Sequence, residues 1–311
     1  MENVWFSFNS IAPIFILMGL GWLLHRIGFL RDSFVDAATK VVFNICIPCM
    51  LFRDICSNDF DQTFDVNLLL AAAGGTVFVY VLLYLLTPLW IKDRPTRAAF
   101  VQASFRSNFV VIGVPIVGNV AGSLGVAKVA LALCVIAPLY NILAVLVLAT
   151  AQPDAKGRVL WRKIITNPMI IGSLLGILAS LIDLRLPLFL YEPVDALASM
   201  SMPLALLALG GAFSPSKSAE DIPLAAAAAV FKTVFNPLLM LPLFFWMDLS
   251  RLDIVVLMIL FACPTAIASF PMAYQMQANH RLASMAIVFS NALSLFTLFA
   301  FIYTLRLLGW V

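Results

Sequence analysis

Long apolar segments constrain the fold of this chain more than any other feature of its sequence. A helix that crosses the hydrocarbon core of a bilayer needs about 20 mostly apolar residues. Ten segments meet this condition, namely 9–28, 34–53, 66–90, 97–121, 126–149, 164–183, 190–213, 222–246, 253–277 and 282–307. Polar and apolar residues do not alternate along them, which excludes a β-barrel. The sequence therefore predicts an all-α integral membrane protein with ten transmembrane helices in a lipid bilayer.

The composition excludes several other classes of protein. Of the 311 residues, 63% are hydrophobic and 11% are charged, whereas a soluble domain is about 45–50% apolar. Neither a water-soluble domain nor a disordered chain fits this balance. The net charge of +3 is too small to indicate nucleic acid as a partner. The five cysteines have no spacing typical of a disulfide or metal framework, so we expect no cofactor, and leave a coupling ion, Na⁺ or H⁺, open.

The distribution of basic residues predicts the orientation. Cytoplasmic loops of membrane proteins carry an excess of Lys and Arg. One set of loops holds twelve basic residues: Arg26, Arg31, Lys40, Lys92, Arg94, Arg97, Lys156, Arg158, Arg162, Lys163, Lys217 and Arg281. The opposite set holds four, which are Arg53, Arg185, Arg251 and Arg306. We therefore expect the first set in the cytoplasm and both termini on the outer side of the plasma (inner) membrane.

Proline and glycine positions recur at an offset close to half the chain length. The pairs are Pro13 and Pro168, Gly21 and Gly176, Pro48 and Pro203, Pro88 and Pro242, and Pro115 and Pro271. They favour two repeats of five spans, at 1–150 and 164–311, joined by a cytoplasmic linker at 151–163. Because five is odd, the second repeat would enter the membrane inverted, as in many secondary transporters. The alternative is that membrane helices simply use proline often.

The fourth span of each half, 97–121 and 253–277, is predicted to be broken. Gly113 and Pro115 in the first, and Pro264 and Pro271 in the second, interrupt long apolar runs. Proline removes a backbone hydrogen bond and clashes with the preceding turn. Broken backbone at membrane depth is tolerated where it lines a cavity or is buried. We expect the two helices to cross at their breaks, where the N-terminal ends of the second halves would favour an anion.

One charged residue lies near this expected crossing. Arg106 follows Arg97 by nine residues, which places it about 13 Å into the membrane. The spans carry acidic residues only near their ends, and none near the middle to pair with it, so the partner could be an anionic substrate, or Arg106 could cap free carbonyls or extend to the surface. The candidate substrate-binding residues are Arg106, Ser107, Asn108, Asn141, Thr265 and Ser269, with Ser269 also a candidate helix cap. Lys128 and Lys232 are expected to extend to the membrane surface.

These motifs resemble the auxin efflux carrier family of membrane transporters, which includes plant auxin exporters and bacterial carriers of dicarboxylates such as malonate and malate. The resemblance covers nearly the whole chain. It rests on Asn44 and Pro48, Phe105-Arg-Ser-Asn108 with Gly113-Val-Pro115, Asn167-Pro168, Pro203 with Leu209-Gly-Gly211, and Pro264-Thr-Ala with Phe270-Pro271-Met-Ala273. Two departures from plant members disfavour auxin itself: the linker is short, and the third span, 68–86, has no acidic residue.

The resemblance implies a fold and a mechanism. Spans one, two, six and seven would form a scaffold that also makes a homodimer, and spans three to five and eight to ten would move as a transport domain. Asn108 would bind the substrate carboxylate. The resulting prediction is a secondary transporter, not an enzyme, that moves a small organic anion by elevator-like alternating access. The alternatives are a sodium-coupled organic anion symporter of the bile-acid type and a membrane sensor that does not transport.

Overall fold

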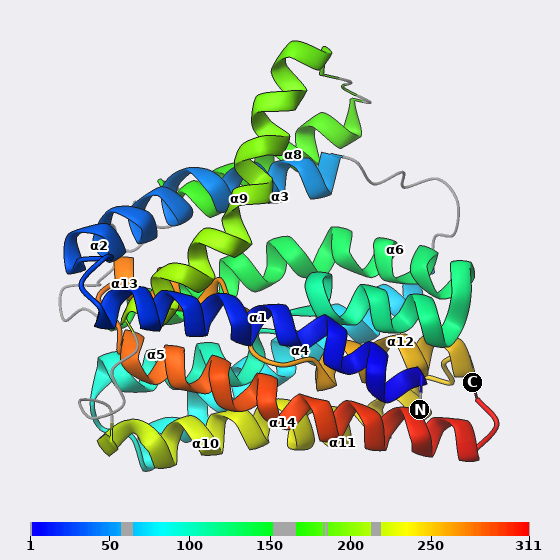
Figure 1. Ribbon diagram of the computed structural model, residues 1–311. Helices are drawn as coiled ribbons and strands as arrows, with labels where there is room; N and C mark the ends of the chain where they lie inside the picture. Colours follow the sequence, from blue (N-terminus) through cyan, green and yellow to red (C-terminus); the bar gives the residue numbers. More distant parts are fainter. Residues whose placement is uncertain are drawn as a thin grey trace.

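A computed structural model describes residues 2–56, 65–151, 166–182, 184, 186–212 and 219–310, and in these residues the fold is helical (Figure 1). The elements are α1 (Glu2–Arg26), α2 (Asp32–Val41), η1 (Val42–Cys46), α3 (Ile47–Cys56), α4 (Val66–Leu86), η2 (Thr87–Leu89), α5 (Arg94–Phe105), η3 (Phe109–Gly113), α6 (Val114–Ala149), α8 (Pro168–Leu181), α9 (Leu188–Ala212), η5 (Ala219–Asp221), α10 (Ile222–Val230), η6 (Phe231–Phe235), α11 (Asn236–Trp246), α12 (Arg251–Ala262), α13 (Ser269–Gln275) and α14 (His280–Leu307).

Six stretches of the described chain are long and apolar enough to cross a membrane. They are Asp32–Cys56, Val66–Leu89, Phe109–Ala149, Leu188–Ala212, Ile222–Trp246 and His280–Leu307, with two shorter apolar helices at Pro13–Arg26 and Pro168–Leu181. The prediction of an all-α membrane protein is confirmed. The α6 helix covers parts of two expected spans, because it runs across a kink at Gly122, where φ is 62°. Two expected spans, 97–121 and 253–277, are interrupted near their middles.

Side-chain caps fix several helix starts on the chain. The Asp65 carboxylate accepts a hydrogen bond from the Leu68 backbone N–H at the start of α4, and Asn167 caps α8 in the same way. Asn279 caps α14. Each cap satisfies an N–H group that has no partner within its own helix. The linker 151–163 lies outside the described residues except Ala151, as do the side chains of the basic residues Lys156, Arg158, Arg162, Lys163, Arg185 and Lys217.

Two pairs of helices pack with close backbone contact. The α1 helix packs against α9 and α3 packs against α8 (Figure 1). A Cβ atom added at Gly21 of α1 would lie 2.3 Å from the Leu207 carbonyl oxygen of α9. One added at Gly176 of α8 would lie 3.0 Å from Cβ of Ile55 in α3. Glycine is therefore required at both contacts, because a side chain would push the helices apart.

The remaining helices surround the two interrupted ones. The α10 helix packs against α14, and α4 packs against α6. Every residue of 98–105 in α5 and of 253–262 in α12 is buried, which makes these two segments the centre of the structure. Both ends of the chain lie at the same end of the helical bundle (Figure 1).

Candidate functional site

The two interrupted helices meet at their breaks. The α5 helix ends at Phe105 and helix resumes at Phe109, while α12 ends at Ala262 and α13 begins at Ser269. Between them, Ser107 and Thr265 form an isolated antiparallel bridge. The Asn108 N–H donates to the Pro264 carbonyl at 2.8 Å, and the Ala266 N–H donates to the Arg106 carbonyl at 3.1 Å. The backbone groups that the breaks release are thus paired with each other, as a buried backbone requires.

The breaks lie only in part where the sequence predicted them. Of the four residues expected to mark them, only Pro264 lies within a break. Gly113, Pro115 and Pro271 lie inside helix, one or two turns after the interruption. The reason is that proline is tolerated in the first turn of a helix, where its missing N–H would have no partner. At Pro115, the preceding π-helical turn η3 gives room for the ring.

Side chains at the crossing hold the ends of the first half-helices. The Ser107 hydroxyl donates to the Leu260 carbonyl at 2.6 Å, and the Thr265 hydroxyl donates to the Ala103 carbonyl at 2.8 Å. Each break therefore supplies a side chain that caps the C-terminal end of the other interrupted helix, α12 or α5. For Thr265, which is fully buried, this is a structural role in the crossing.

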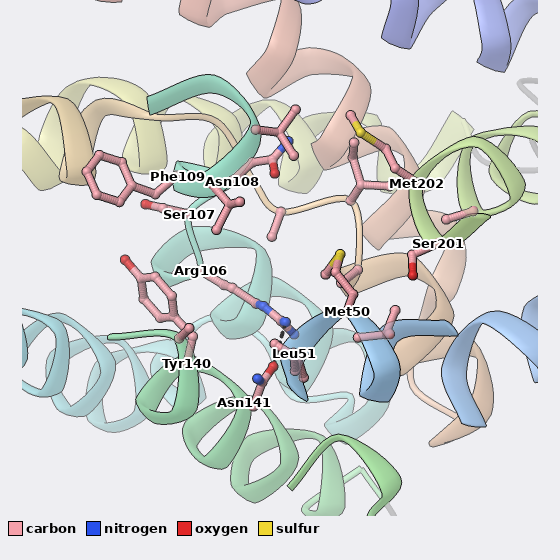
Figure 2. A pocket seen from close by; sticks show the side chains of 18 of the residues that line it. Met50, Leu51, Arg106, Ser107, Asn108, Phe109, Tyr140, Asn141, Ser201 and Met202 are labelled. Carbon is pink, nitrogen blue, oxygen red and sulfur yellow. Dashed lines mark hydrogen bonds between the residues drawn. The ribbon is translucent and has the colours of Figure 1, made fainter. Parts of the chain in front are cut away.

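A cavity of about 110 Å³ opens beside the crossing (Figure 2). It lies between α3 and α9 on one side and the crossing and α6 on the other. Its lining is mostly apolar and comprises Ile47, Met50, Leu51, Arg106, Ser107, Asn108, Phe109, Val110, Val111, Leu133, Ala137, Tyr140, Asn141, Ser201, Met202, Ala205, Ala266, Ile267 and Ala268. Four predicted site residues, Arg106, Ser107, Asn108 and Asn141, come together in this lining. Thr265 and Ser269 do not line it.

Arg106 is the one charged residue in the lining of this cavity. Its side chain does not extend to the surface, because the residue is only 6% exposed. One guanidinium nitrogen, Nη2, donates to Oδ1 of Asn141 at 2.7 Å (Figure 2), and Nη1 donates to the sulfur of Met272. Asn141 in turn donates to the Ser173 hydroxyl of α8 at 3.3 Å. Within the described residues, Arg106 forms no ion pair with a carboxylate.

Three polar groups in the cavity lining lack hydrogen-bond partners. The Asn108 side-chain nitrogen, the Tyr140 hydroxyl and the Ser201 hydroxyl are all buried and unpartnered in the described part of the chain. Buried polar groups in this state are uncommon in folded proteins and indicate an unseen partner. Ser201, on α9, was not predicted from the sequence. Ser269 was predicted to cap α13, but the cap residue is Ala268, and the Ser269 hydroxyl is buried without a partner away from the cavity.

The two lysines that were expected to reach the surface both have partners in the structure, Lys232 in the interior and Lys128 at a partly exposed position. Lys232 is fully buried, and its ammonium donates to the Phe261 carbonyl at 2.6 Å, so the prediction is wrong for this residue. The Lys128 ammonium contacts the carboxylates of Asp253 at 2.5 Å and Asp65 at 2.9 Å. The hydrogen bond from Lys128 lowers the pKa of the Asp65 carboxyl below its usual value. In the part of the chain that the structure describes, no three His, Cys, Asp or Glu side chains lie together as a metal site would require.

Comparison with known proteins identifies relatives along nearly the whole length. A family model described as membrane transport protein matches residues 6–156 and 155–302. A putative malonate transporter of Rhizobium meliloti (strain 1021) is 23% identical over 305 residues, which cover 95% of each chain. An uncharacterized transporter of Methanocaldococcus jannaschii is 21% identical, with 97% of this chain and 98% of that one covered.

Proposed function

Because this chain belongs to the membrane transport protein family, also called the auxin efflux carrier family, we propose that it is a secondary transporter for a small organic anion. Family membership makes it a membrane transporter and not an enzyme. The substrate that we propose is a mono- or dicarboxylate. The observation that carries the proposal is the buried guanidinium of Arg106, which lines the cavity without a carboxylate partner among the described residues.

The polar groups of the cavity fit a carboxylate. A buried charge is costly unless an opposite charge or several hydrogen bonds compensate it. Arg106 provides a planar fork of N–H donors that matches the two oxygens of a carboxylate. The unpartnered side-chain nitrogen of Asn108 adds a further donor. A ligand with acceptor oxygens and negative charge would therefore satisfy both groups together.

The backbone around the cavity supports the same ligand chemistry. Phe109, Val110 and Val111 line the cavity and form the first turn of the helix that resumes after the break. The first N–H groups of a helix lack partners within it, and the helix dipole places partial positive charge there. Residues 266–268, directly before α13, line the same cavity. Anions bind readily at such helix starts.

The size of the cavity favours a small substrate. Its volume of about 110 Å³ is well below the roughly 300–1,000 Å³ typical of pockets for drug-sized ligands. A bile acid or auxin would therefore need a larger space than this conformation provides. The relative from Rhizobium meliloti carries the name putative malonate transporter, and we propose a short dicarboxylate of this kind for the present chain.

We further propose alternating access between two inverted five-helix repeats. If the repeats are real, α1 corresponds to α8 and α3 corresponds to α9. The contact between α1 and α9 then corresponds to the contact between α8 and α3. Gly21 lies in the first contact and Gly176 in the second, at matching positions of α1 and α8. In this proposal α1 to α3, α8 and α9 form the scaffold and the homodimer. The remaining helices carry the site across the plasma membrane in an elevator-like motion, with both termini outside. The position of the cavity between α3 and α9 and the crossing supports this division.

A ligand screen tests the proposed substrate class. The melting temperature of the purified protein would be measured with malonate, succinate, malate, lactate and the neutral isostere malonamide at matched ionic strength. A ligand that binds only the folded state raises this temperature, so we expect a rise with a carboxylate and none with malonamide. An equal rise with malonamide, or no rise with any carboxylate, would contradict the proposal.

Uptake measurements then test transport itself. The best ligand, isotopically labelled, would be offered to liposomes that contain the protein and to empty liposomes. We expect accumulation or exchange only where the protein is present. Binding without any flux across the liposome membrane would instead favour the sensor alternative.

A further inference from the structure

Lys232 is a buried cation that the anion site does not use. It lies in the π-helical turn η6 between α10 and α11, and its exposure is 0%. Its ammonium donates to the Phe261 carbonyl at 2.6 Å. Within the described residues it forms no ion pair with a carboxylate. An isolated ammonium in a protein interior needs compensation from another source of negative charge.

The end of a broken helix supplies this negative charge. Phe261 is the last residue but one of α12, which ends at Ala262. The last carbonyl groups of a helix have no partners within it, and together they carry about half a negative charge. The Lys232 ammonium donates to one of these carbonyls, that of Phe261, so a full positive charge lies at the negative end of the half-helix.

The other interrupted helix, α5, ends against the same segment, η6 and the start of α11. Asn236, four residues after Lys232, donates to the Ser104 carbonyl at 2.7 Å, and Ser104 is next to the last residue of α5. Lys232 and Asn236 therefore lie one turn apart and each hold the C-terminal end of one half-helix. Two such ends together amount to about one negative charge, which the single charge of Lys232 balances.

We infer that the Lys232 ammonium is a tethered cation that takes the place of a coupling sodium ion at the crossing. In transporters with broken helices, unwound carbonyls and the C-terminal ends of half-helices are the groups that bind a coupling cation. Here those groups are occupied from within the chain. The Leu260 carbonyl accepts from Ser107 and the Ala103 carbonyl accepts from Thr265. With the proposed transport function as its premise, the inference assigns sodium-independent anion transport to this chain.

The test measures cation binding without any organic anion. Melting temperatures of the purified wild type and Lys232→Met would be recorded in sodium chloride and in choline chloride of equal ionic strength. We expect the wild type to melt at the same temperature in both salts. Lys232→Met removes the ammonium and keeps most of the stem, so we expect a lower melting temperature in choline and a saturable rise of a few degrees with sodium.

A matched control distinguishes the effect of losing the charge from the effect of losing a hydrogen bond to a helix end. Asn236→Leu removes the equivalent bond on the same helix without removing a charge. We expect it to lower the melting temperature equally in both salts. If Lys232→Met does not fold, Lys232→Gln, which keeps a polar head group, takes its place and should show the same sodium response.

Two results would overturn the inference. A sodium-specific rise in the wild type would mean that a separate sodium site exists. A folded Lys232 variant with no sodium response would mean that Lys232 only caps α12. Neither result depends on the substrate, so a failure of the proposed anion transport is detected separately, by the ligand screen and the uptake assay.

Discussion

Replacement of Arg106 by glutamine should weaken carboxylate binding strongly and leave the stability of the empty protein nearly unchanged. The variant keeps a polar side chain of similar reach and removes only the charge and the forked donor. In the wild type, Arg106 is buried and bonded to Asn141 and Met272, with no carboxylate partner in the described residues. Under the proposed function, a bound anion compensates its charge.

The magnitude follows from that burial. Truncation of one member of a buried, hydrogen-bonded charge pair costs about 2–5 kcal/mol of binding free energy, so Kd should rise at least ~30-fold. For the empty protein, the loss of two hydrogen bonds costs about 0.5–1.5 kcal/mol each. Relief from the desolvation of an uncompensated charge offsets this loss. The free energy of unfolding should therefore change by roughly 1 kcal/mol or less.

Isothermal titration of the detergent-solubilised protein with its best carboxylate gives Kd, and melting curves give the stability. Arg53→Gln is the matched control. Arg53 forms ion pairs with Asp54 and Asp195 and does not line the cavity. We expect this control to melt at a lower temperature, because it removes two ion pairs, and to keep the Kd of the wild type.

The opposite pattern would refute the reasoning. If Arg106→Gln keeps the wild-type Kd and loses several degrees of melting temperature, the guanidinium holds the crossing together and does not bind the substrate. If both variants lose affinity equally, the effect comes from general loosening of the helices.

Three further predictions follow from single contacts. Gly21→Ala should lower the free energy of unfolding by about 1–3 kcal/mol, because its Cβ would lie 2.3 Å from a backbone oxygen of α9. The control Gly19→Ala, whose Cβ would have no atom within 4 Å, should not lower it; equal melting temperatures of the two variants would refute this. Asp65→Asn should lower the melting temperature at pH 7, because the bond from Lys128 lowers the pKa of this carboxyl below 3.8 and so stabilises the fold when the carboxyl is ionised. The difference from the wild type should shrink as the pH falls below 3.8 and through the lowered pKa; a difference that stays constant down to the lowest pH would contradict it. Asn108→Ala should weaken carboxylate binding without loss of melting temperature, because the side-chain nitrogen has no partner in the described residues; unchanged affinity in a titration would remove it from the site.

Much of the fold could be predicted from the sequence, because apolar length is a local property of the chain. The all-helical membrane fold and the family were predicted from the apolar segments and the motifs, and both are confirmed. Pro264 lies within its break, but Pro115 and Pro271 were also predicted to mark the breaks and lie after them. Proline indicates that a helix is interrupted nearby, but it is tolerated for a turn after a new helix begins, so it does not fix the residue at which the break lies.

The candidate site was predicted in part for a similar reason. Arg106 and Asn108 are conspicuous because polar residues in an apolar segment are costly and need a partner. Their position in one cavity agrees with the prediction, while their role in binding stays a prediction. Ser201 could not be identified, because a serine in an apolar helix can face lipid, protein or a cavity. The rotation of α9 decides this, and it depends on packing that a single sequence does not specify.

The contrast between Arg106 and Lys232 shows why burial alone does not indicate a binding site. Both are cations buried near the crossing, and neither has a carboxylate partner in the described chain. Lys232 lies at the C-terminal end of α12, where the helix supplies the compensating negative charge. Arg106 directly follows α5, but its guanidinium reaches Met272 near the start of α13, where the partial charge is positive and adds to its own. The Lys232 end of the crossing is therefore compensated within the protein, whereas we propose that the Arg106 end receives its negative charge from a ligand.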